Sequence, residues 1–209
     1  MAPGALGHLP PAQLAAGAVC AGAASLLPDL DCPGSTVARA LGPLSGLLAR
    51  LVSLIAGGHR NGTHSLLAWL ALSVGLTLAL GTRHSSAVAL IVCVLACGLM
   101  LRVITEARAT ACAVLALGAA VALVTGVGLV DHWMPGAVLV GYGSHLLGDL
   151  VTVEGVPLLW PLSGRRQRVT LIGATDDRRE HLVCLGAGAL GAYLAVTLIA
   201  VPALAAAAK

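Results

Sequence analysis

The sequence of 209 residues is short of charge. Lys, Arg, Asp and Glu together make up 10% of it, whereas soluble globular domains carry about a quarter. So few charged side chains cannot cover a water-facing surface, so the composition excludes a soluble enzyme, a disordered chain and a nucleic-acid-binding protein. With 58% of its residues apolar, the sequence predicts an integral membrane protein.

The sequence also lacks Phe and a disulfide framework. Phe does not occur, and Ala, Leu, Gly and Val supply most of the apolar content. The six Cys residues show no disulfide framework, because all except Cys32 lie inside apolar runs, where they behave as small hydrophobic side chains.

Six apolar runs predict an all-α, polytopic membrane bundle of about six transmembrane helices. A hydrocarbon core of roughly 30 Å needs about 20 helical residues. The runs cover residues 12–28, 65–81, 86–103, 109–130, 136–151 and 182–206. The first and fifth are short and carry polar residues, which leaves a tilted, half-buried or re-entrant path open. We expect one integral membrane domain over 1–209, with a cytoplasmic loop at 152–181.

Basic residues predict the orientation of this bundle in the cell (inner or plasma) membrane, because Lys and Arg are enriched in cytoplasmic loops. With the N-terminus outside, ten basic residues fall on the cytoplasmic side: Arg39, Arg50, Arg60, Arg102, Arg108, Arg165, Arg166, Arg168, Arg178 and Arg179. Only Arg83 and Lys209 fall outside. Both termini are therefore predicted to lie outside the cytoplasm.

The segment 37–56 is apolar but interrupted by small and basic residues at helical spacing. Arg39 and Arg50 fall on one helix face, about three turns apart. This pattern is typical of a helix lying in the cytoplasmic membrane interface. The alternative is a seventh, short buried helix.

Ionisable residues near membrane spans are candidates for function, and the first group follows the first run. Asp29 and Asp31 stand one residue apart between Pro28 and Pro33, so an extended segment can direct both carboxylates at one cation. The alternative is a polar helix terminus, although acidic residues at a helix C-terminus oppose the helix dipole.

The second group precedes the second run. His59 and His64 are five residues apart, about 140° around an ideal helix, so they converge only on a turn such as this Gly-rich segment allows. The alternative is two interfacial histidines beside lipid headgroups.

The third group lies in the fifth run. His145 and Asp149 are four residues apart and share one helix face, with Cβ atoms about 6 Å apart. They are suited to bind a metal or to act as an acid/base pair. The alternative is an internal His–Asp hydrogen bond.

The predicted topology places all three groups at the cytoplasmic ends of their spans, as a single site requires. Imidazole and carboxylate without thiolate favour a divalent metal ion, Zn²⁺ first and Mn²⁺ or Fe²⁺ as alternatives, in one or two copies.

Three motifs carry a resemblance to a known family: LPDLD at 27–31, GHRxxTHS at 58–65 and GYxSHxxxDxxTxxGVPLLWPL at 141–162. The sequence resembles the bacterial inner-membrane proteins described as metal-dependent hydrolases and as LexA-binding, formerly a domain of unknown function. The match runs from Gly7 and His8 to about position 161, and it departs from the family at Cys32 and Asn61.

The resemblance implies a membrane-embedded, metal-dependent hydrolase. Its motif residues, carried over to this sequence, give the metal ligands His8, Asp29, Asp31, His59, His64, His145 and Asp149. A straight first helix would put His8 about 30 Å from Asp29, so either that span is broken or His8 is not a ligand.

The candidate catalytic residues are Asp31 as general base, Arg60 for substrate phosphate, and Ser144 within the third motif. A phosphohistidine lipid phosphatase is excluded because Val138 and Leu139 stand where its Ser-Arg pair belongs. The HExxH motif of a metalloprotease is missing. A serine-nucleophile turn fails because Ser144 and His145 point to different helix faces.

The expected partners are membrane lipids and a small-molecule or lipid-linked substrate such as a phosphoester, with no nucleic acid and a protein partner left open. The rival reading is a non-catalytic protein: a metal-stabilised membrane scaffold, a regulator-binding protein or a transporter. A coordination position open to a cavity would favour the hydrolase.

Overall fold

The computed structural model describes residues 11–40, 42–105, 118 and 133–170. Within these ranges the chain is helical and has no strand, only an isolated bridge between Val156 and Gln167. The elements are α1 (Pro11–Ala24), η2 (Pro28–Asp31), α2 (Thr36–Arg39), α3 (Pro43–Ala56), η3 (Gly62–His64), α4 (Leu66–Leu80), α5 (Ser85–Thr105) and α7 (Met134–Leu150). The predicted all-α class is confirmed for this part of the chain.

Local sequence signals set the helix boundaries that matter for the site. The hydroxyl of Ser65 accepts a hydrogen bond from the Ala68 amide at 3.1 Å and so caps the start of α4. Gly57, with φ +77°, ends α3 in the left-handed conformation that Gly adopts most easily. The turn between these two helices is therefore fixed at both ends.

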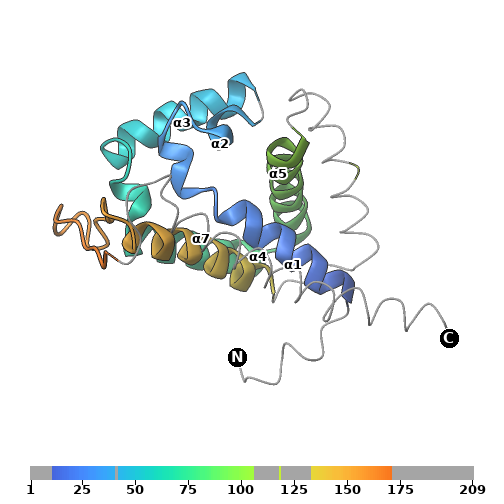
Figure 1. Ribbon diagram of the computed structural model, residues 1–209. Coiled ribbons are helices and arrows are strands. Elements are labelled where there is room, and N and C mark those ends of the chain that lie inside the picture. The colour runs from blue at the N-terminus through green and yellow to red at the C-terminus, as the bar shows by residue number, and fades with distance from the viewer. Residues whose placement is uncertain (1–10, 41, 106–117, 119–132, 171–209) are drawn as a thin grey trace.

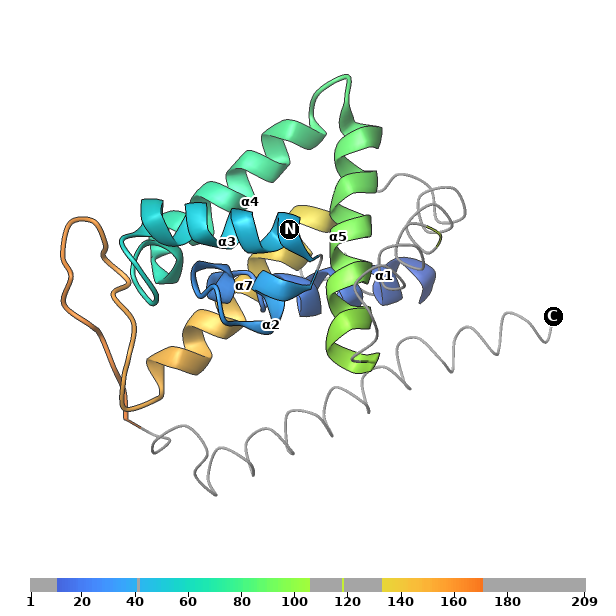
Figure 2. The same ribbon diagram turned by 90° about the horizontal axis from the view of Figure 1, so that it is seen from above.

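The helices pack closely through small residues. α1 packs against both α5 and α7, and α4 packs against α7 (Figure 1). A Cβ added at Gly141 on α7 would lie 2.0 Å from the Ala21 carbonyl oxygen of α1, so the two backbones are in direct contact there. Seen from above, α5 stands steeply across α1 (Figure 2).

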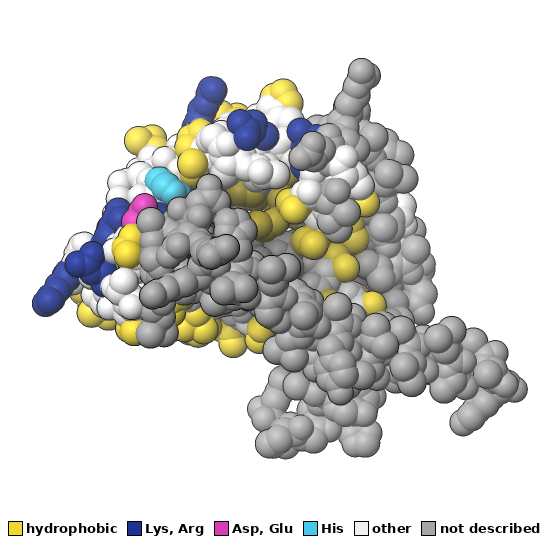
Figure 3. Space-filling view, viewed as in Figure 1, with side chains coloured by type: hydrophobic (Ala, Val, Ile, Leu, Met, Phe, Trp, Pro, Cys, Tyr) yellow, Lys and Arg dark blue, Asp and Glu magenta, His cyan; other side chains and the backbone are white. Residues whose placement is uncertain are grey.

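Many large apolar side chains are exposed, and small side chains make up much of the buried core. The main buried cluster is made mostly of small side chains, among them Cys20, Ala23 and Ala96. By contrast, Leu54 is 79% exposed and Leu78 is 68% exposed. Among the described residues α3 carries one charged side chain, Arg50, and the 151–170 segment carries four, Glu154, Arg165, Arg166 and Arg168. In Figure 3 the charged side chains are few and lie near the top and at the left end of the visible face. Such a surface is suited to lipid rather than water.

Two segments have the length and composition of membrane spans, Gln13–Asp31 and Ser85–Val103. Length and composition are weak signals alone, but the apolar exterior supports them. α4 and α7 match the predicted runs 65–81 and 136–151 but have only 15 and 17 residues. The runs 109–130 and 182–206 lie outside the described residues, so the number of about six spans stays a prediction.

The predicted single helix over 37–56 is wrong in one respect, since the structure divides the segment into α2 and α3. The break falls at Gly42, with φ +72°, and Pro43, whose ring cannot continue a helix from the preceding turn. α3 nevertheless exposes its large apolar side chains, so it is not the buried helix of the alternative reading.

Candidate metal centre

Three chain segments far apart in sequence meet at one end of the bundle. η2, which follows α1, supplies Asp29 and Asp31, and η3, which precedes α4, supplies His64. The last turns of α7 supply His145 and Asp149. The ends of three neighbouring helices therefore bring the carboxylates and imidazoles of all three predicted groups together.

Four donor atoms form the centre of this cluster. The Nε2 atoms of His64 and His145 each lie 3.5 Å from Asp149 Oδ2 and 3.7 Å from Asp29 Oδ1. Neighbouring ligands of a tetrahedral Zn²⁺ lie about 3.3–3.5 Å apart, given bond lengths of about 2.0–2.2 Å. These four nitrogen–oxygen distances are therefore close to those expected around one ion of this size, and Asp149 adjoins the group formed by Asp29, His64 and His145.

The same atoms lack other partners. His64 Nε2, His145 Nε2 and Asp149 Oδ2 are buried, and none of them has a hydrogen-bond partner in the described part of the chain. Buried polar atoms are normally paired, because an unpaired one forfeits its hydration without compensation. A bound cation would account for three such atoms that converge on one point. Among the described residues, Asp29, His64 and His145 lie close enough together to hold a metal ion.

Asp31 has a different environment from Asp29. Its side chain is completely buried, and it accepts hydrogen bonds from His59 Nδ1 at 2.7 Å, from the Arg60 amide at 3.0 Å and from the Thr63 hydroxyl. Both carboxylate oxygens are thereby engaged with the turn that carries His64. The structure thus brings Asp31 and His59 beside the four donor atoms but pairs them with each other.

Thr63 and Tyr142 belong to the motifs, but the sequence did not indicate their role. The Thr63 hydroxyl lies 3.0 Å from His64 Nδ1, and the Tyr142 hydroxyl donates to the Thr63 carbonyl oxygen. This chain of contacts connects α7 to η3 and fixes the ring of His64. Metal-binding histidines commonly have such a partner on the second ring nitrogen.

Arg60 lies at the edge of the cluster. Its Nη2 is 3.3 Å from Asp149 Oδ1, and its Nη1 donates to Glu154. Glu154 was not predicted as a site residue, and its only sequence signal was its place five residues after Asp149. The guanidinium therefore stands between a candidate metal ligand and a half-exposed carboxylate.

Comparison with known proteins fits this picture. A family model described as YdjM inner membrane protein matches residues 1–208. The chain belongs to the YdjM inner membrane protein family. The match confirms the resemblance to an inner-membrane family and supports an inner-membrane location.

Two curated YdjM proteins are similar to the chain. The inner membrane proteins YdjM of Escherichia coli (strain K12) and of Shigella flexneri are each 29% identical to it over 160 residues, which is 77% of this chain and 57% of the relative. The aligned region thus covers little more than half of each relative. No solved structure matches the chain.

Two predicted site residues of this YdjM-family chain are not part of the cluster as described. His8 lies outside the described residues. The Ser144 hydroxyl donates to the Gly141 carbonyl oxygen at 2.7 Å, and its side chain lines an apolar groove between α4 and α7. No hydrogen bond within the described ranges connects Ser144 to the four donor atoms.

Burial and the neighbouring carboxylates have opposite effects on the pKa of His64 in this YdjM-family chain. Burial disfavours the imidazolium ion and by itself would lower that pKa, but the nearby carboxylates of Asp29 and Asp31 favour the charged ring and raise the pKa above its ordinary value. Without a metal ion the site therefore favours a proton on His64, which is the charge that a cation would replace.

Proposed function

We propose that this protein is a metal-dependent hydrolase embedded in the inner membrane, with its site at the cytoplasmic face. The observation that carries the proposal is the convergence of buried, unpaired His64 Nε2, His145 Nε2 and Asp149 Oδ2 beside Asp29. Two imidazoles and a carboxylate are the protein ligand set of many catalytic zinc sites. Zn²⁺ is the first choice, with Mn²⁺ or Fe²⁺ as alternatives.

His64, His145 and Asp149 would hold the ion, and Asp29 would be the fourth, exchangeable ligand. Asp29 is 36% exposed, whereas Asp149 is 13% exposed and His64 is fully buried. The exposed side is where a water molecule or substrate reaches the centre. A bound ion of this kind polarises a phosphoryl or carbonyl oxygen and lowers the pKa of a bound water to about 7.

The remaining residues handle protons and orientation. Asp31 accepts from His59 Nδ1, which directs the lone pair of Nε2 away from Asp31 and leaves it free to take a proton. His59 is 43% exposed, so it can pass that proton to water. Asp31, predicted as the general base, would thus act through His59. In hydrolysis of a phosphoester, water oxygen bonds to phosphorus and the alcohol leaves with a proton.

Metal analysis of the purified protein, followed by hydrolysis assays on phosphomonoesters, phosphodiesters and lipid phosphates, tests the proposal. We expect one to two divalent ions per chain and a turnover that disappears with a chelator and returns with Zn²⁺. Protein without bound metal after reconstitution with Zn²⁺, Mn²⁺ and Fe²⁺ would refute it.

The second candidate is a metal-stabilised scaffold, and one observation favours it. If Asp29 and Asp149 both bound the ion together with His64 and His145, the four protein ligands would leave no open position, as in structural zinc sites. In that case the chelator would lower the unfolding temperature while no ester is hydrolysed. The Asp29→Ala variant separates the two, since a structural site loses its metal and a catalytic one retains it.

A further inference from the structure

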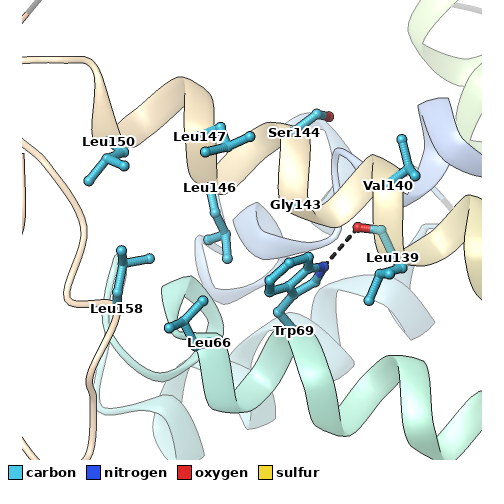
Figure 4. A pocket seen from close by; sticks show the side chains of 10 residues that line it. All are labelled: Leu66, Trp69, Leu139, Val140, Gly143, Ser144, Leu146, Leu147, Leu150 and Leu158. Carbon is cyan, nitrogen blue, oxygen red and sulfur yellow. Dashed lines mark hydrogen bonds between the residues drawn. The ribbon is translucent and has the colours of Figure 1, made fainter. Parts of the chain in front are cut away.

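An apolar groove lies between α4 and α7, beside the candidate metal centre. It has a volume of about 390 Å³ and is lined mainly by leucines (Figure 4). The indole N–H of Trp69 donates to the Leu139 carbonyl oxygen at 2.8 Å, which holds the ring as one wall. A side chain at Gly143 would collide with this ring, so the wall is closely packed.

The groove and the centre share the same helix ends. Leu150 follows Asp149 directly, Leu66 is two residues beyond His64, and both line one end of the groove (Figure 4). Leu158 closes that end, since its carbonyl oxygen accepts from the Leu66 amide at 3.0 Å. The residues at this end of the groove are thus one or two positions along the chain from two candidate ligands.

The opposite side of the groove reaches the apolar exterior. Val140 is 65% exposed and Leu147 is 63% exposed, and both line the groove. In a protein of an inner-membrane family, such a surface faces hydrocarbon. An alkyl chain can therefore enter from the bilayer.

Positive charge lies at the edge of the candidate metal centre. Arg60 contacts Asp149 through Nη2, its Nε has no partner in the described part of the chain, and its Nη1 is held only by the half-exposed Glu154. A guanidinium binds phosphate bidentately, and an incoming phosphate would displace the carboxylate of Glu154. A bound divalent ion would add to this attraction.

We propose that the groove binds one acyl chain of a phospholipid whose phosphate lies on Arg60, so that a membrane phospholipid is the substrate class of the site. The inference rests on the proposed function, because a lipid bound in the groove is a substrate only if the centre hydrolyses its ester bond. The apolar lining of the groove and the positive charge at the candidate metal centre match the two parts of such a molecule.

Photo-crosslinking of the full chain tests the proposal. The probe is phosphatidic acid with a diazirine in one acyl chain, mixed into phosphatidylcholine vesicles that contain the protein and a chelator, so that no turnover occurs. We expect labels in groove residues of α4 and α7. Leu147→Trp, which fills the groove, should lose this labelling, whereas Leu78→Trp, an equally exposed site on α4 outside it, should retain it.

The charge is tested separately. Arg60→Gln should weaken labelling by phosphatidic acid about tenfold, as expected for the loss of a charge-assisted hydrogen bond, and leave labelling by the matching diacylglycerol unchanged. Equal loss with both probes would refute the role of Arg60.

Two outcomes would overturn the groove as a lipid site. Equal labelling around Leu78 and in the groove would mean ordinary boundary lipid only. A crosslink from a cysteine at position 147 to another segment of this chain or to a second copy would mean that protein fills it. Failure of the proposed function is distinguishable, because labelling without any ester hydrolysis refutes only the hydrolase, and hydrolysis of a soluble phosphoester without labelling refutes only the groove.

Discussion

His59 and His64 are close in sequence and differ in role, and the difference is testable residue by residue. His64 is fully buried with an unpaired Nε2, whereas His59 is 43% exposed and bonded to Asp31. We expect His64→Gln to abolish metal binding and His59→Gln to weaken it about 10- to 100-fold, as for a residue that orients ligands. Elemental analysis and metal titration measure both, and equal loss in the two variants would contradict the assignment.

The raised pKa of His64 predicts how metal binding depends on pH. A metal ion must replace the proton on the imidazole, and the carboxylates of Asp29 and Asp31 hold that proton up to a higher pH than usual. Metal affinity should therefore fall as the pH decreases through the raised pKa, and it should level off above it. Titration calorimetry in buffers of different ionisation enthalpy should detect a released proton near neutral pH. Affinity that stays constant from pH 6 to about pH 8 would contradict this.

At the scale of residues, the sequence predicted the ligands that lie on a regular helix, but it did not predict the contacts made by the turn between α3 and α4. The i, i+4 spacing placed His145 and Asp149 on one face, and both contribute to the cluster. The pairing of Asp31 with His59 depends on Gly58 and Arg60, whose φ angles are +99° and +58°, and no periodicity encodes such a turn. The contact of Glu154 with Arg60 joins residues 94 positions apart and had no local signal.

At the scale of helices, the contact between α1 and α7 decides whether the ligands meet. A Cβ at Gly141 would lie 2.0 Å from the Ala21 carbonyl oxygen, whereas one at Gly136 on the same helix would meet nothing within 4 Å. Gly141→Ala should push the helices apart, cost about 1–3 kcal/mol through overpacking and reduce metal content. Gly136→Ala is the matched control and should be neutral or slightly stabilising. Thermal unfolding in detergent and elemental analysis provide the measurements, and equal stability of both variants would contradict the close packing.

Helix existence was predictable here and helix length was not. The apolar runs 65–81, 86–103 and 136–151 correspond to α4, α5 and α7, because a long apolar run has few other ways to satisfy its backbone in lipid. The first run was expected to be short, and α1 has 14 residues, about 21 Å at 1.5 Å per residue. α1 ends at Ala24, and the chain turns through η2, which brings Asp29 and Asp31 to the cluster. This turn is a consequence of tertiary contacts that composition does not contain.

At the scale of the molecule, the described helices bring the candidate metal ligands to one end of the bundle, and the side of the membrane on which this end lies is the last prediction. α1 and α7 end at the cluster and α4 begins there, so these three helix ends must lie on the same membrane side. Ten basic residues against two predict that this side is the cytoplasm. In a chain whose native cysteines are replaced, Thr82→Cys, between α4 and α5, should react with an impermeant maleimide in spheroplasts. Leu162→Cys, which is 92% exposed in the loop after α7, should react only after the membrane is opened. The reverse pattern would place the centre outside the cytoplasm, where the excess of arginine would have to serve a purpose other than orientation, such as holding anionic lipid at the surface of the site.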